Sequence, residues 1–195
     1  MRKKSHISLA KGVIHGLGVK DRITHRLSFY IGSIWPDCTP SFITKRHCVD
    51  ETFEVFMDKM SKFINKFNPK KDMGIVSTWR MGVVLHYIAD YFTFPHNKHY
   101  SGTLKDHCIY EEELKHSMYD YVDGVRAVNK LYKLPNLLDI KQIEQYIKEK
   151  HSQYMTYRGN VDLDCNYAFS VCMSVMSALL DIVSGKNQVS AEMIA

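Results

Sequence analysis

Apolar side chains recur every three or four residues along most of the chain. This spacing places them on one face of a helix, and it predicts seven helices over residues 6–17, 23–34, 49–67, 77–92, 104–131, 140–151 and 163–183. Prolines and glycines lie near several of the expected helix ends. No alternating strand pattern, hairpin dipeptide or internal repeat is present. The pattern therefore predicts an all-α, single-domain helical bundle of about seven helices.

Two of the expected helices have distinct features. The helix that carries His86 is expected to open at Ser77, because serine is a favoured N-cap residue. The last helix, 163–183, is the most apolar and is expected in the centre of the bundle. We interpret its Met173 and Met176 as packing residues and not as a ligand pair.

Composition limits the class of protein. The 195 residues suit one domain, 1–195, and 45% hydrophobic with 24% charged residues argues against disorder and against a membrane-embedded chain. The longest uncharged stretch, Cys165 to Leu180, is shorter than the roughly 20 residues that span a bilayer. We therefore expect no transmembrane segment. The net charge of +5 suits an anionic substrate but does not by itself identify one.

Cysteines and the N-terminus bear on the compartment. The five cysteines are odd in number and form no Cys-x-x-Cys pair, which argues against a disulfide framework and a thiolate zinc site. Lys11 and His15 interrupt the apolar stretch that a signal peptide would need. The expected location is therefore cytoplasmic.

The candidate chemistry is concentrated in residues 86–111. His86 and Asp90 are four residues apart, as are His107 and Glu111, and His96 lies between the two pairs. Residues four apart project from one face of a helix, and imidazole with carboxylate is a ligand set for zinc, manganese or iron. A single such pair is more often a solvated ion pair. The helix around the first pair is rich in apolar and aromatic residues, however, and buried imidazoles and carboxylates need partners.

Three further candidates lie where helices are expected to start or stop. His6 heads the first helix, Asp37 follows the second, and His47 precedes the third. Side chains at such positions can converge on one end of a bundle. Each is also a common turn, cap or surface residue when it stands alone. The remaining histidines have no comparable placement and are expected at the surface or behind the ligands; they are His15, His25, His99, His116 and His151.

The order of these residues resembles the zinc-dependent phospholipase C family, whose all-α fold is shared with fungal single-strand nucleases. The resemblance covers about residues 5–120 and rests on His6, Pro36-Asp37, His47, His86-Tyr87-x-x-Asp90, Pro95-His96 and His107-x-x-x-Glu111. It implies three zinc ions in a cleft at one end of the bundle. By similarity, His47, His86 and Asp90 hold one zinc, and His96, His107 and Glu111 hold a second. Asp90 or an equivalent carboxylate bridges, and His6 and Asp37 serve the third.

Two positions depart from the family pattern. The family also holds its third zinc through the amino group and carbonyl of an N-terminal Trp, whereas five residues and no Trp precede His6 here. We therefore expect two zinc ions, with the third lacking those ligands. Pro95 lies five residues after Asp90 instead of four, so the turn that delivers His96 is altered and His99 is the fallback ligand.

The resemblance predicts a metal-dependent phosphodiester hydrolase of the phospholipase C type. A metal-activated water would attack a phospholipid, at a membrane surface, or a related phosphodiester. Asp37 is either the general base or a metal ligand only, and the sequence leaves both roles open. Two alternatives remain: a single-strand nuclease-like hydrolase acting on nucleic acid, and a non-catalytic dimetal protein similar to the diiron hemerythrins. A monomer is expected, and the family's relatives are typically secreted.

Overall fold

The computed structural model describes residues 1–39, 47–68, 73–128 and 133–185. Within these ranges the chain forms seven α-helices, two short 3₁₀ helices and no strand. The α-helices are α1 (Lys3–Gly16), α2 (Arg26–Ile34), α4 (Val49–Asn65), α5 (Ile75–Tyr91), α6 (Leu104–Val128), α7 (Ile140–Tyr154) and α8 (Val161–Val183), and the 3₁₀ helices are η1 (Pro36–Cys38) and η2 (Phe94–His96). The predicted all-α class is confirmed, and each predicted helix has a counterpart.

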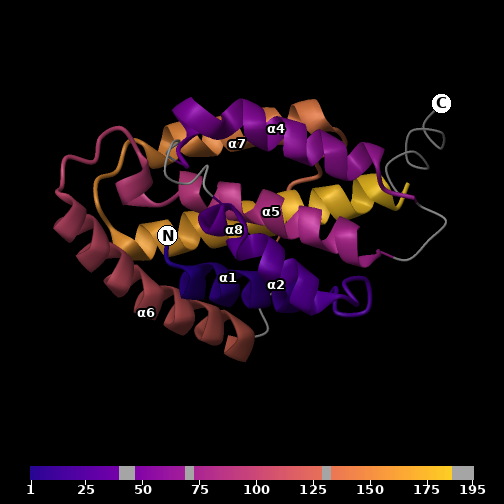
Figure 1. Ribbon diagram of the computed structural model, residues 1–195, viewed down its shortest axis with the longest axis horizontal. Coiled ribbons are helices and arrows are strands. Elements are labelled where there is room, and N and C mark those ends of the chain that lie inside the picture. The colour runs from indigo at the N-terminus through magenta and orange to yellow at the C-terminus, as the bar shows by residue number, and fades with distance from the viewer. Residues whose placement is uncertain (40–46, 69–72, 129–132, 186–195) are drawn as a thin grey trace.

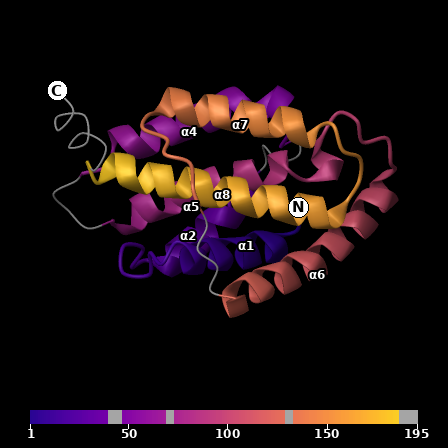
Figure 2. The ribbon, with the colours of Figure 1, turned by 180° about the vertical axis from the view of Figure 1, so that it is seen from behind.

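Helices α5 and α8 form the centre of the bundle. In Figure 1, α5 crosses the middle of the molecule with α4 above it and α1 and α2 below. The opposite view shows α8 across the middle, with α7 above and α6 below (Figure 2). These two central helices contribute more buried apolar side chains than any other helix, Met173 and Met176 among them. The predicted central position of the last helix is confirmed.

Helix α8 also has the length and apolar composition of a membrane-spanning helix. It is the single helix of that kind among those described, and 67% of its most apolar stretch is buried inside the bundle. A buried core helix passes the same test of length and composition, so α8 is weak evidence for a membrane span.

Helices α2 and α5 cross in backbone contact through two glycines. A methyl group added at Gly82 would overlap the carbonyl oxygen of Phe29, and one added at Gly32 would overlap the carbonyl oxygen of Trp79. Glycine is the one residue that permits so close an approach of two backbones. The crossing fixes α2 against the half of α5 that leads to His86 and Asp90.

Two helix starts differ from the sequence expectation. Ser77 is not the N-cap of α5, because the helix begins at Ile75 with Gly74 as its cap. A contact from α2 holds this earlier start, since the Ser28 hydroxyl donates to the Ile75 carbonyl at 2.7 Å. Helix α1 begins at Lys3, so His6 lies one turn inside the helix and not at its head.

We predict that Gly82→Ala destabilises the fold by about 1–3 kcal/mol, because the new methyl group must push the α2 backbone away. The measurement is urea unfolding followed by circular dichroism. Gly124→Ala is the matched control, since a methyl group there meets nothing within 4 Å in helix α6. That variant should gain about 0.5–1 kcal/mol from helix propensity. Equal stability of the two variants would contradict the close crossing.

Candidate metal centre

Eight side chains converge at the end of the bundle where α1 and α6 begin and α5 ends, on the left of Figure 1. They are His6 on α1, Asp37 on η1, His47 ahead of α4, His86 and Asp90 on α5, His96 on η2, and His107 and Glu111 on α6. These are the residues predicted from the sequence as ligands. The structure brings them together, and zinc binding by each of them stays a prediction.

The first group consists of Asp37, His47, His86 and Asp90. Asp90 Oδ2 lies 3.2 Å from both His47 Nδ1 and His86 Nε2, and those two nitrogens are 2.9 Å apart. Asp37 Oδ1 lies 3.6 Å from each of the same nitrogens. These separations are close to about 3.3 Å, the edge of a tetrahedron whose corners lie about 2.0–2.1 Å from a central zinc. The donor set and its spacing therefore fit one zinc ion.

The second group consists of His96, His107 and Glu111. Glu111 Oε1 lies 3.2 Å from His96 Nε2 and 3.1 Å from His107 Nε2. Helix α6 supplies two of the donors one turn apart, and η2 supplies the third. This group offers three protein donors, the number typical of catalytic zinc sites, whereas the first group offers four.

His6 and the amino group of Met1 complete the cluster on the other side of Asp90. His6 Nε2 lies 3.3 Å from Asp90 Oδ1, yet neither ring nitrogen of this fully buried imidazole has a hydrogen-bond partner among the residues described. The Met1 nitrogen lies 2.6 Å from Asp90 Oδ1, 2.9 Å from His96 Nε2 and 3.1 Å from Glu111 Oε1. Buried polar atoms without partners are rare in proteins, and a cation would satisfy them.

The electrostatics favour the protonation states in which side chains bind metal. Burial alone would raise the pKa of Asp90 and of Glu111, but the surrounding imidazoles and the Met1 amino group hold both pKa values well below normal. Burial lowers the pKa of His6 to about 4 and also lowers the pKa of His96. Metals require ionised carboxylates and neutral imidazoles, which is how these four groups stand at neutral pH.

Two groups hold their protons more firmly. Burial lowers the pKa of His86, but Asp90 outweighs it and the net pKa is raised. Burial also lowers the pKa of the Met1 amino group, but the carboxylates of Asp90, Glu111 and Asp37 outweigh burial and raise this pKa to about 10. A metal must displace these protons, so metal uptake is expected to release protons.

A backbone carbonyl fixes the orientation of the His86 ring. The Ser33 carbonyl on α2 lies 2.9 Å from His86 Nδ1 and can act as an acceptor only, so Nδ1 carries the hydrogen. The neutral ring then presents the lone pair of Nε2 to Asp37, His47 and Asp90. Histidine ligands of metals are commonly held in this way. The close crossing of α2 and α5 brings this carbonyl into reach.

The grouping differs from the sequence expectation at Asp37. We expected Asp37 to serve a third ion with His6, but it lies 3.6 Å from His47 and His86 and 3.9 Å from His6. The short η1 helix places it between both positions. Asp90 lies between two sets of donors, because Oδ1 faces His6 and Met1 while Oδ2 faces the first group, and its bridging of two ions stays a prediction.

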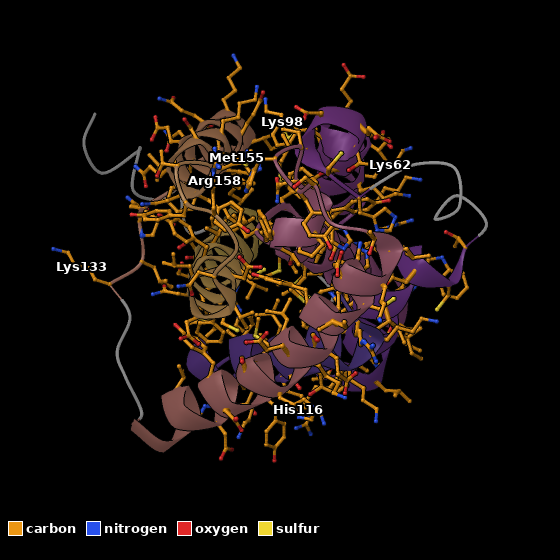
Figure 3. All side chains as sticks on the ribbon, turned by 90° about the vertical axis from the view of Figure 1, so that its left-hand side faces the viewer. Lys62, Lys98, His116, Lys133, Met155 and Arg158 are labelled. Carbon is orange, nitrogen blue, oxygen red and sulfur yellow. The ribbon has the colours of Figure 1, made fainter. Side chains whose placement is uncertain are left out.

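The five remaining histidines lie outside both groups. The His99 ring lies tilted against the Phe94 ring with centres 4.9 Å apart, while η2 brings His96 to Glu111 despite the shifted Pro95. His116 points away from the bundle on the outside of α6 (Figure 3). His151 Nε2 lies 2.8 Å from Asn97 Oδ1. None of them was predicted as a first-choice ligand.

Asp164 on α8 is a buried carboxylate next to the second group that sequence reasoning missed. This buried carboxylate accepts hydrogen bonds from the Phe94 backbone N–H at 2.8 Å, the Tyr110 hydroxyl at 2.9 Å and the Tyr154 hydroxyl at 2.7 Å. Phe94 begins η2, which carries His96, and Tyr110 precedes Glu111 on α6. Asp164 therefore holds the two elements that form the second group.

A signal for Asp164 was present in the sequence. It lies on the helix face of Val161 and Ala168, which are buried, whereas Asp162 in the same turn is exposed. An acid on the apolar face of a central helix needs several hydrogen-bond donors. Burial raises the pKa of Asp164 to about 6, so the carboxylate is largely ionised at neutral pH.

We predict that Asp164→Ala weakens zinc binding by the second group about tenfold or more, a usual cost of losing support behind a ligand. The measurement is zinc content during titration with a chelator. Asp164→Asn keeps an acceptor oxygen for the Phe94 N–H and should restore most of the affinity. Tyr154→Phe is the control, because it removes one donor without touching η2 or α6. Equal zinc affinity in Asp164→Ala and the native chain would contradict the positioning role.

Comparison with known proteins gives a family match. The family model for zinc-dependent phospholipase C matches residues 5–161, a segment that contains all eight clustered side chains. No curated protein and no solved structure matches the chain significantly. The match covers most of the sequence and includes both ligand groups, and the chain therefore belongs to the zinc-dependent phospholipase C family.

Proposed function

We propose that the protein hydrolyses the phosphodiester bond of a phospholipid and releases the phosphorylated headgroup. Membership of the zinc-dependent phospholipase C family supports this reaction class. The observation that carries the proposal is that both ligand groups lie next to the fully buried Asp90, whose Oδ2 is 3.2 Å from His86 Nε2 in the first group and 3.8 Å from His96 Nδ1 in the second. A cluster of this composition is typical of a site for several divalent cations.

The proposal assigns one zinc to Asp37, His47, His86 and Asp90 and another to His96, His107 and Glu111. His6 is the remaining candidate donor, and it would hold a third ion together with Asp90. When bound, such ions lower the pKa of a shared water towards 7 and stabilise the attacking and leaving oxygens at phosphorus. The zinc content of the protein distinguishes two ions from three.

Exposure within the cluster indicates where a substrate enters. His6, His86 and Asp90 are completely buried, whereas His107 is 28% exposed and Asp37 and Glu111 are partly exposed. A phosphodiester would therefore approach over the second group and Asp37. On the buried side, Tyr87 contacts the rings of His47 and His86 and helps to exclude water from the first group.

Asp37 is the carboxylate best placed to meet a substrate. Oδ1 belongs to the first group, and the side chain is partly open to solvent, unlike Asp90. It can position or deprotonate a water while it holds the ion, so both roles expected from the sequence fit its place.

We predict that the zinc-loaded protein releases phosphocholine from phosphatidylcholine and that a chelator abolishes this activity. Asp37→Asn should lower the rate by about 100-fold or more, the usual contribution of a general base. Zinc content measured on the same variant separates the two roles, because a base-only effect leaves zinc unchanged and a ligand effect removes it. Nucleotide release from single-stranded DNA without phosphocholine release would favour the nuclease alternative. A coloured, iron-loaded protein without hydrolytic activity would favour the hemerythrin-like alternative.

We predict that His86→Ala or Glu111→Ala lowers bound zinc by about one ion per chain and lowers the melting temperature, because binding to the native state stabilises it. Atomic emission gives the zinc content. His116→Ala is the matched control, since His116 and Glu112 have the same four-residue spacing on the exposed side of α6. Unchanged zinc in both ligand variants would defeat the assignment of these groups.

A further inference from the structure

A surface formed by α2 and the first turns of α5 exposes an unusual set of apolar side chains. We call it the tryptophan face; its members are Leu27, Ile31, Trp35, Ile75, Val76 and Trp79. Leu27 is 71% exposed, Ile31 42% and Trp35 45%. These three are spaced four residues apart and form one ridge along α2. Five of the ten exposed large hydrophobic side chains among the residues described belong to this face.

The face is continuous across the two helices. The Ser28 hydroxyl bonds to the Ile75 carbonyl, and Leu27, Ile31 and Ile75 line one shallow hollow. The rings of Trp35 and Trp79 meet edge to face with their centres 5.8 Å apart. Figure 1 shows α2 and α5 side by side at the front of the molecule, with α4 next to α5. Both tryptophans of the protein therefore lie in this one surface.

Basic side chains border the face. Arg26 and His25 line the hollow beside Leu27. Lys59, Lys62 and Arg80 line a second hollow beside Trp79. Lys62 is paired with Asp58 and projects from the outside of α4 (Figure 3). No acidic side chain of the described residues lines either hollow. The border therefore complements a negatively charged surface.

The face leads directly to the metal centre. Trp35 ends the ridge, and the next residues, Pro36 and Asp37, form η1 and supply a candidate ligand. A surface that lies against α2 would therefore end close to the partly exposed Asp37.

We propose that the tryptophan face docks on an anionic phospholipid bilayer, a partner that rests on the proposed phospholipase function. Tryptophan favours the membrane interface, where its ring is apolar and its N–H stays hydrated. An apolar helix face flanked by Lys and Arg binds an anionic bilayer by burial and by charge attraction together. Docking in this orientation brings lipid headgroups to the end of the bundle that carries Asp37.

The test uses the zinc-loaded protein and vesicles of equal parts phosphatidylcholine and phosphatidylglycerol, with brominated phosphatidylcholine as quencher. Because both tryptophans lie in the face, intrinsic fluorescence reports its docking without a label. We expect a blue shift on mixing, quenching by the brominated lipid, and loss of both in high salt. An unchanged emission spectrum would overturn the proposal.

Variants locate the binding surface. The double variant Leu27→Glu with Ile31→Glu should bind vesicles about tenfold or more weakly, because it adds charge to the apolar ridge. Tyr119→Glu with Leu138→Glu makes the same charge change at exposed positions away from α2 and should bind as the native chain does. Equal binding by the two double variants would overturn the assignment of the face.

Hydrolysis of water-soluble p-nitrophenyl phosphocholine separates this proposal from the proposed function. The Leu27/Ile31 variant should keep this activity and lose activity on vesicles. Hydrolysis of the soluble ester without any vesicle binding would overturn the docking proposal and support the proposed hydrolase function. Vesicle binding without hydrolysis of either substrate would overturn the proposed hydrolase function and support docking through the tryptophan face. Self-association that the same two substitutions abolish would show that a second copy occupies the face, and would overturn the lipid proposal.

Discussion

The fold depends on the groups that offset the negative charge of one buried carboxylate, Asp90. Asp90 has no solvent exposure, and burial strongly opposes its charge. His6 on α1, His47 ahead of α4, His86 on α5 and His96 on η2 all lie against its two oxygens. Each of these elements must place its imidazole next to the same buried charge, and this requirement fixes where the ends of the elements lie. The bundle therefore closes around the candidate metal centre, and the centre is part of the fold rather than an addition to it.

The glycine contact between α2 and α5 carries this constraint to the first ligand group. Without side chains at Gly32 and Gly82, the two backbones approach until the Ser33 carbonyl reaches His86 Nδ1. That hydrogen bond selects the ring nitrogen that faces the cluster. The close packing of α2 on α5 thus determines the tautomer of His86.

The sequence predicted the helices because their apolar residues recur periodically, and it predicted the eight candidate ligands because of their spacing and order along the chain. Four-residue spacing marked His86 with Asp90 and His107 with Glu111, and family order linked them to His6, Asp37 and His47. What it could not predict depends on contacts between distant segments. The start of α5 follows from Ser28, the place of Asp37 from η1, and the position of the Met1 amino group from the docking of α1. Asp164 left a local signal, but its donors come from η2, α6 and α7.

Helix α2 shows how a short element can separate recognition from chemistry. Its inner side carries the buried Phe29, Gly32 and Ser33, and the Ser33 carbonyl orients His86. Its outer side carries the exposed Leu27 and Ile31. Because helix geometry points these two sets in different directions, changes on the outer side leave the inner contacts in place. The C-terminal end of the same helix leads through Trp35 to Asp37. A lipid surface held by the outer side would therefore be fixed relative to the metal centre through nine residues of rigid helix and the short turn that follows.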